Sequence, residues 1–156
     1  MSQIERSDTV VVGLGNPILR DDGVGVHVVR ALSPRLRAAG IAATEGGYVG
    51  LGFLDVLTGF RKAIIIDAIR TEDGRPGNIY RLNLDDIETR ACTPWSHHLG
   101  LAAVLKSARD LGVEVPTEVT LFAVEVKDVG FGEGCTPKVE RTIPRVVKML
   151  SERLGV

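Results

Sequence analysis

The chain has 156 residues, of which 44% are hydrophobic and 25% are charged, and its formal net charge is −1. Length and composition predict a single globular domain over residues 1–156 and exclude a disordered or fibrous protein. The near-neutral charge argues against a partner that is nucleic acid or an anionic membrane, because phosphate binding needs clustered Lys and Arg side chains.

Targeting features and cysteine usage predict a cytoplasmic protein. No apolar stretch approaches the roughly 20 residues that a membrane-spanning helix needs, and residues 1–6 lack the hydrophobic region of a secretory signal. Cys92 and Cys135 form no Cys-x-x-Cys unit, which favours a reducing compartment. Without a heptad pattern or an exposed apolar stripe, we expect a monomer.

Apolar runs alternate with helical periods in the first half of the chain, which predicts a layered α/β fold. Pro34 falls inside a helical pattern and is expected to kink or shorten the last turn of that helix. The predicted elements are, in order, a strand at Thr9–Leu14, a helix with an apolar stripe over 24–36, a strand at 41–45, a short helix at Leu51–Leu57 and a strand at 63–67.

The second half begins with a run whose residues alternate between apolar and polar, which predicts an antiparallel edge strand with one solvated face. Pro144 interrupts the apolar stripe of the last helix, so we expect a kink there. The predicted elements are a strand at 79–84, a loop over 85–96, a helix with apolar positions from 101 to 111 that Gly112 ends, a strand at 119–126, a glycine-rich loop over 129–134, and a final helix with Thr136 as N-cap and Pro137 as N1. Together they predict a three-layer α/β/α sandwich around a mostly parallel five-stranded sheet with one antiparallel edge strand.

Three residues stand where a predicted strand or loop gives way to the next element: Asp22, Asp67 and His97. An ionised carboxylate next to a buried strand such as that before Asp67 costs several kcal/mol unless it is paired or coordinated. Ligands of open α/β sheets bind at the carboxyl ends of the strands. Two carboxylates and one imidazole at this edge predict a metal site with three protein ligands and an open position, suited to Ni²⁺ or Zn²⁺ without selecting between them.

Each of these residues also has a plainer interpretation, which for Asp67 is a buried carboxylate that caps a nearby backbone turn. Asp21 or Asp22 would serve as the N-cap of the following helix, and since one carboxylate suffices, we assign Asp21 to the turn and Asp22 to the site. Gly23 and Gly25 then leave space for a close partner. A single histidine at a helix start is more often structural, and only its place beside two aspartates favours a site role for His97.

Competing chemistries are less well supported. Gly13-x-Gly15 is followed by Ile18 where a dinucleotide-binding fingerprint needs a third glycine. Cys92 paired with His97 would be a nucleophile, but nothing in the sequence predicts a lowered thiol pKa. His27 lies off the apolar stripe of its helix and is expected to be exposed.

The whole chain resembles the nickel-dependent hydrogenase maturation endopeptidases. The matching segments lie in the same order and at similar spacing, which is more specific than any one of them: GLGNP at 13–17, DDGVG at 21–25, GG at 46–47, IDA at 66–68, HHLGL at 97–101 and GCTPKVE at 134–140.

This resemblance implies a three-layer sandwich and an endopeptidase that removes the C-terminal extension of a nickel-loaded [NiFe] hydrogenase large-subunit precursor. It implies Asp22, Asp67 and His97 as metal-binding and catalytic residues, with the nickel supplied by the precursor. Gly46, Gly47, His98 and the loop at 129–134 are expected to line the substrate groove.

Two other functions stay open at this stage. Peptidyl-tRNA hydrolases share a similar start at residues 13–17 on a related sandwich, but they need a basic surface and place a His-Asn pair where this chain has Asp21 and Asp22. A nickel-binding maturation chaperone without peptidase turnover would use the same ligands as the protease.

Overall fold

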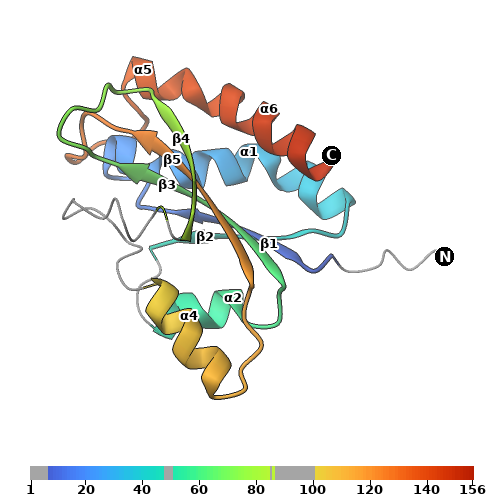
Figure 1. The fold of residues 1–156 in the computed structure, drawn as a ribbon. Coiled ribbons are helices and arrows are strands. Elements are labelled where there is room, and N and C mark those ends of the chain that lie inside the picture. Colours follow the sequence, from blue (N-terminus) through green and yellow to red (C-terminus); the bar gives the residue numbers. More distant parts are fainter. Residues whose placement is uncertain (1–6, 48–50, 85, 87–100) are drawn as a thin grey trace.

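A five-stranded sheet forms the centre of the protein, with strand order β2-β1-β3-β5-β4 (Figure 1). The computed structural model describes residues 7–47, 51–84, 86 and 101–156. The strands are β1 (Thr9–Leu14), β2 (Ala42–Gly46), β3 (Lys62–Ile69), β4 (Ile79–Asn83) and β5 (Glu118–Glu125). β4 pairs antiparallel with β5 and the other pairings are parallel, which confirms the predicted mixed sheet with one antiparallel edge.

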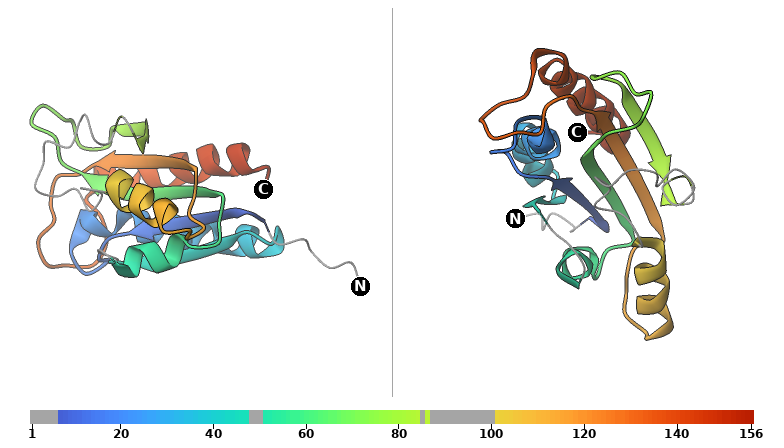
Figure 2. Two further views of the ribbon diagram at one scale, coloured as in Figure 1. Left: turned by 60° about the horizontal axis from the view of Figure 1, so that its bottom comes forward. Right: turned by 90° about the vertical axis from the view of Figure 1, so that its left-hand side faces the viewer.

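Helices cover both faces of this sheet, so the three-layer prediction is confirmed (Figures 1 and 2). The helices α1 (Val24–Ala38), α5 (Pro137–Glu140) and α6 (Thr142–Leu154) lie on one face, and α2 (Leu51–Leu57) and α4 (Leu101–Asp110) lie on the other. No described helix is both long and apolar enough to cross a membrane.

The two hydrophobic clusters of the core follow from the period of two along each strand. Val12 and Ile65 belong to the cluster on the α2/α4 face, whereas Val11, Ile64 and Ile66 belong to the cluster on the α1/α6 face. Because β1 and β3 are covered on both sides, their sequences are apolar at nearly every position.

Both prolines that were expected to disturb helices have milder effects. α1 continues for four residues beyond Pro34 and ends at Ala38, so that proline does not shorten it. The break in the C-terminal helical segment falls between α5 and α6, and Pro144 lies in the first turn of α6. A proline is tolerated there because the first-turn N–H groups have no intrahelical partner anyway.

Strand boundaries differ from the prediction where the ladder continues. β3 extends two residues beyond Asp67, because β5 pairs with it up to the Ile69–Glu125 pair. Asp67 therefore lies inside the strand and does not end it. β2 likewise includes Gly46, which pairs with Leu14 of β1.

Candidate functional site

The edge at which the parallel strands end, here called the carboxyl edge, contains a topological switch point between β1 and β3. The chain leaves β1 through α1 to reach β2, then crosses back over β1 to form β3 on its other side. α1 and α2 make these two connections on opposite faces of the sheet (Figure 2). A crevice outside the strand ends at such a point is where open α/β sheets bind ligands.

Asp22 is held at this switch point by the turn that follows β1. It lies in the 3₁₀ helix η1 (Arg20–Gly23), which packs against β3, and its residue is only 6% exposed. The backbone N–H of Asn16 donates a hydrogen bond to Asp22 Oδ2 at 2.8 Å. Gly15 has φ +125°, and a Cβ there would overlap the carbonyl oxygen of Asp22. A glycine is therefore needed for η1 to fold back onto the end of β1.

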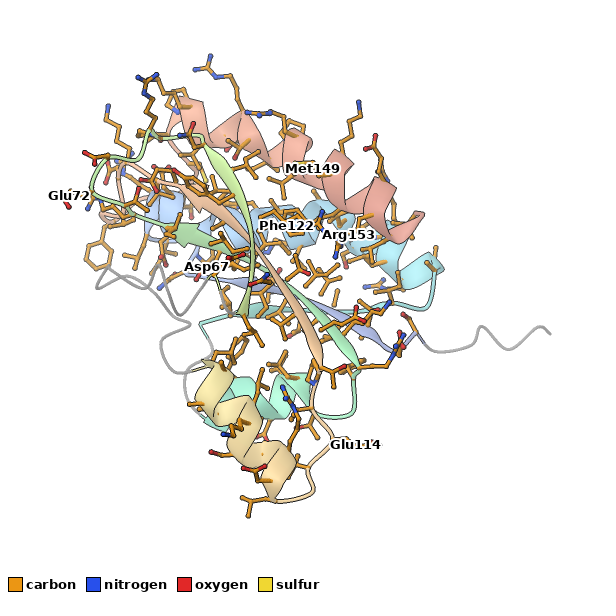
Figure 3. All side chains as sticks on the ribbon, in the orientation of Figure 1. Asp67, Glu72, Glu114, Phe122, Met149 and Arg153 are labelled. Atoms are coloured by element: carbon orange, nitrogen blue, oxygen red, sulfur yellow. The ribbon has the colours of Figure 1, made fainter. Side chains whose placement is uncertain are left out.

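Asp67 approaches the same point from β3 and is fully buried (Figure 3). The last β1–β3 pair is Gly13 with Ile66, so Asp67 is one residue beyond the point where β1 and β3 separate, while it still pairs with Ala123 of β5. The backbone N–H of Ala68 donates to Asp67 Oδ1 at 2.7 Å. Because side chains alternate along a strand, Asp67 lies on the same face of the sheet as Ile65, which is the α2/α4 face.

His97 and His98, together with Cys92, lie outside the described residues, so the structure does not test their predicted roles. α4 begins at Leu101, and its C-terminal end leads to the amino edge, where Gly59 N–H donates to the carbonyl oxygen of Glu114 at 2.9 Å. The start of α4 accordingly lies toward the carboxyl edge (Figure 2).

The close partner expected beside the glycines after Asp22 is the backbone of the protein itself. A Cβ on Gly25 would overlap the carbonyl oxygen of Ile66, and a Cβ on Gly23 would lie 2.6 Å from Pro17 Cα. Gly25 also lies against Gly13, where a Cβ would overlap the Gly25 carbonyl oxygen. The space is thus filled by the protein itself, and these glycines allow α1 to pack directly on the backbones of β1 and β3.

Asp21 joins the turn after β1 to the loop after β5. Its fully buried carboxylate accepts hydrogen bonds from the backbone N–H groups of Lys127 and Asp128, both at 3.0 Å. It also accepts from the backbone N–H of Thr136 at 2.6 Å and from Thr136 Oγ1 at 2.9 Å. The Asp21 N–H in turn donates to the carbonyl oxygen of Asp128 at 2.9 Å. The assignment of Asp21 to the turn is confirmed, but it caps no helix: the N-cap of α1 is Gly23.

The two glycines predicted for the substrate groove differ in their surroundings. Gly46 ends β2 with φ +147°, and its carbonyl oxygen accepts a hydrogen bond from Gly15 N–H at 3.3 Å. Gly47 is exposed, and a Cβ there would meet no described atom within 4 Å. The positive φ of Gly46 is thus a structural reason for glycine at that position, whereas no described residue explains a glycine at Gly47. Their role in the groove stays a prediction.

Glu125 is a fourth buried carboxylate, which the sequence did not single out. It is only 1% exposed at the end of β5, on the same face as Asp67. It accepts hydrogen bonds from Thr71 N–H at 2.9 Å and Thr71 Oγ1 at 2.6 Å, which fasten the β3–β4 loop to β5. The glutamate that directly follows the apolar run at 121–124 was the feature that could have marked it.

His27 is less exposed than expected. Its residue is partly buried, and its Nε2 atom is buried with no hydrogen-bond partner among the described residues.

Cys135 is unsuited to act as a nucleophile. Burial raises the pKa of its thiol to about 12, and the negative charges of Asp21 and Glu140 add to this effect.

In a Cys92→Ser variant, where Cys135 is the only cysteine, we expect alkylation by iodoacetamide at pH 8 to be more than about 100-fold slower than for an exposed thiol. Mass spectrometry follows the reaction. The same variant in guanidinium should react at the ordinary rate, and fast labelling of the folded protein would contradict the prediction.

Comparison with known proteins decides between the functions that the sequence leaves open. The profile of the hydrogenase maturation protease family (HycI) matches residues 26–153. The chain belongs to the hydrogenase maturation protease family. It is therefore a hydrolase of peptide bonds.

Individual members of the family support this assignment. The chain is 33% identical to the hydrogenase 2 maturation protease of Escherichia coli (strain K12), over 86% of this chain and 82% of that protein. It is 30% identical to a putative hydrogenase maturation protease of Methanocaldococcus jannaschii, over 72% and 74% of the two chains. The structure of the hydrogenase maturating endopeptidase HybD from E. coli superposes with a TM-score of 0.78 at 29% identity, covering 94% of this chain and 91% of that one.

Among the three functions left open by the sequence, membership in this family favours the protease over the peptidyl-tRNA hydrolase and the chaperone. The matched region includes Asp67 and the segment at 97–101, and it begins just after Asp22.

Proposed function

We propose that this protease removes the C-terminal extension of a [NiFe] hydrogenase large-subunit precursor after nickel has been inserted. The observation that supports the proposal is that Asp22, in the η1 turn that packs against β3, and Asp67, one residue beyond the last β1–β3 pair, both lie at the carboxyl edge beside the switch point. Carboxylate oxygens at such an edge are suitable ligands for a divalent cation.

The ligand chemistry of these residues fits a divalent ion of borderline softness. Asp22 and Asp67 supply oxygen ligands whose carboxylates are oriented by the N–H groups of Asn16 and Ala68. His97, four residues before α4, would add an imidazole nitrogen. Three protein ligands of mixed oxygen and nitrogen type leave positions open for groups of the substrate.

We assign nickel to the substrate and not to the resting enzyme, although Zn²⁺ would suit the same ligands. When bound, such an ion polarises the peptide carbonyl at the cleavage point. Asp22 and Asp67 hold the metal-bearing end of the precursor, and either carboxylate acts as general base toward the attacking water. Gly46, Gly47 and His98 line the groove for the extended tail, and the loop at 129–134 borders it.

The test uses the purified chain and its cognate precursor with the extension intact. We expect mass spectrometry to show one cut near the C-terminus of the nickel-loaded precursor and an unchanged mass for the nickel-free precursor. An unchanged mass for the loaded precursor would overturn the proposal and favour a chaperone. Equal cutting of both forms would show that nickel is not recognised.

Four further expectations concern assembly, partners and location. We expect the protease to be a monomer that binds neither nucleic acid nor membranes, and to act in the cytoplasm. Sedimentation of the purified protein, alone and with DNA or lipid vesicles, checks the first three, and cell fractionation checks the fourth.

A further inference from the structure

Two large apolar side chains stand out from the surface on neighbouring backbone segments near the candidate site. Ile18 is 52% exposed and Phe131 is 84% exposed. Their segments are joined because Gly132 N–H donates to the carbonyl oxygen of Ile18 at 2.9 Å, and Leu19 and Gly132 form a parallel β-bridge. We call Ile18, Phe131 and the backbone between them the Ile18–Phe131 rim.

The backbone under this rim is held in place from several sides. Arg20 N–H donates to the carbonyl oxygen of Gly132 at 3.0 Å, and Arg20 Nε donates to that of Phe131 at 3.3 Å. The buried Asp21 carboxylate fixes the residues on both sides of this loop, and Asp128 Oδ1 accepts a hydrogen bond from Gly130 N–H at 2.9 Å within it. Phe131 therefore projects from a loop that is already held by hydrogen bonds. Binding of a partner over Phe131 would cost little conformational entropy of this loop.

The rim is continuous with the candidate site. Ile18 and Leu19 belong to the same turn as Asp22, whose N–H donates to the carbonyl oxygen of Leu19 at 3.0 Å. Asp22 is thus tied to one segment of the rim, and Asp21, the residue before it, is tied to the loop that carries the other segment. A protein substrate bound at Asp22 would therefore lie next to the turn that carries Ile18 and to the loop that carries Phe131.

We propose that the Ile18–Phe131 rim docks an apolar segment on the body of the large-subunit precursor, next to its C-terminal extension. This inference rests on the function proposed above and adds a contact outside the bond that is cut. Buried aromatic side chains are frequent anchors of protein interfaces. A second copy of this chain is the less suitable occupant, because it would cover the edge that holds Asp22 and block the site.

The test compares Phe131→Ser and Ile18→Ser with the unchanged protease on nickel-loaded precursor. We expect Phe131→Ser to raise KM, and the Kd for uncleaved precursor, by about 10- to 100-fold, which is the range expected from losing one buried aromatic contact. The kcat at saturating precursor should stay within about twofold, because uniform binding lost equally from ground and transition states leaves kcat unchanged. Ile18→Ser should act in the same direction with a smaller effect.

Leu111→Ser is the matched control, since Leu111 is 83% exposed and follows α4 at the opposite edge of the sheet. It should leave KM, Kd and kcat unchanged. The inference is overturned if Phe131→Ser cleaves with an unchanged KM, or if it acts only by changing the oligomeric state in sedimentation. Failure of the unchanged protease to bind or cleave the precursor would overturn the proposed function together with this inference, so the two failures can be told apart.

Discussion

Asp67→Asn is expected to lower the rate of precursor cleavage by more than about 100-fold while the protein stays folded. Changing a residue that merely supports a metal ligand typically costs 10- to 100-fold, so removing the charge of a proposed ligand should cost at least as much. Asparagine has nearly the same shape and keeps an oxygen that accepts the Ala68 N–H at the position of Asp67 Oδ1. The substitution therefore changes the chemistry of the site more than its packing.

Cleavage followed by mass spectrometry, with circular dichroism of each variant, measures this effect. Asp73→Asn makes the same chemical change in an exposed turn of the β3–β4 loop and should leave the rate unchanged. Full activity of a folded Asp67→Asn variant would show that the site lies elsewhere.

Gly25→Ala is expected to lower the free energy of unfolding by about 3 kcal/mol, at the upper end of the usual cost of overpacking. Alanine favours a helix over glycine by about 1 kcal/mol, but a Cβ at this position would overlap the carbonyl oxygen of Ile66 and lie 2.7 Å from that of Leu14. Both obstacles are backbone atoms in the central strands, so α1 itself has to move away from the sheet.

Urea denaturation measures this loss, and Gly52→Ala in α2 is its matched control. Gly52 is exposed, and a Cβ there would meet no described atom within 4 Å, so its replacement should raise the free energy of unfolding by about 0.5–1 kcal/mol. Equal effects of the two substitutions would show that α1 adjusts to a Cβ without cost. Since α1 begins two residues after Asp22, Gly25→Ala should also impair cleavage.

The elements were predictable because their signals are local. The alternation within 79–84 predicted the antiparallel edge strand, which the structure has at Ile79–Asn83. Thr136 and Pro137 predicted the start of the last helical segment, and they are its N-cap and first-turn proline. The break in that segment was misplaced at Pro144, because a proline in a first turn has the same sequence signature as one in a helix interior, and only the observed helix start distinguishes them.

The candidate site was only partly predictable, because its partners come from distant parts of the chain. Asp21 was assigned to the turn and Asp22 to the site, on the argument that one carboxylate suffices for the turn. The Lys127, Asp128 and Thr136 groups that hold Asp21 could not be identified, since nothing local relates them to it. Gly25 was expected to leave space for a close partner, but nothing local identified that partner as the carbonyl oxygen of Ile66 in β3.

The amino-acid sequence by itself determined the layered α/β class, the mixed sheet and the placing of Asp22 and Asp67 next to buried strands, because hydrophobic period and strand-end chemistry act over a few residues. Only the tertiary structure decided that η1 packs against β3 at the switch point, that Asp21 ties the turn after β1 to the loop after β5, and that Ile18 and Phe131 stand side by side. These contacts depend on the order of the strands in the sheet and on close backbone packing, which arise only when the whole chain has folded.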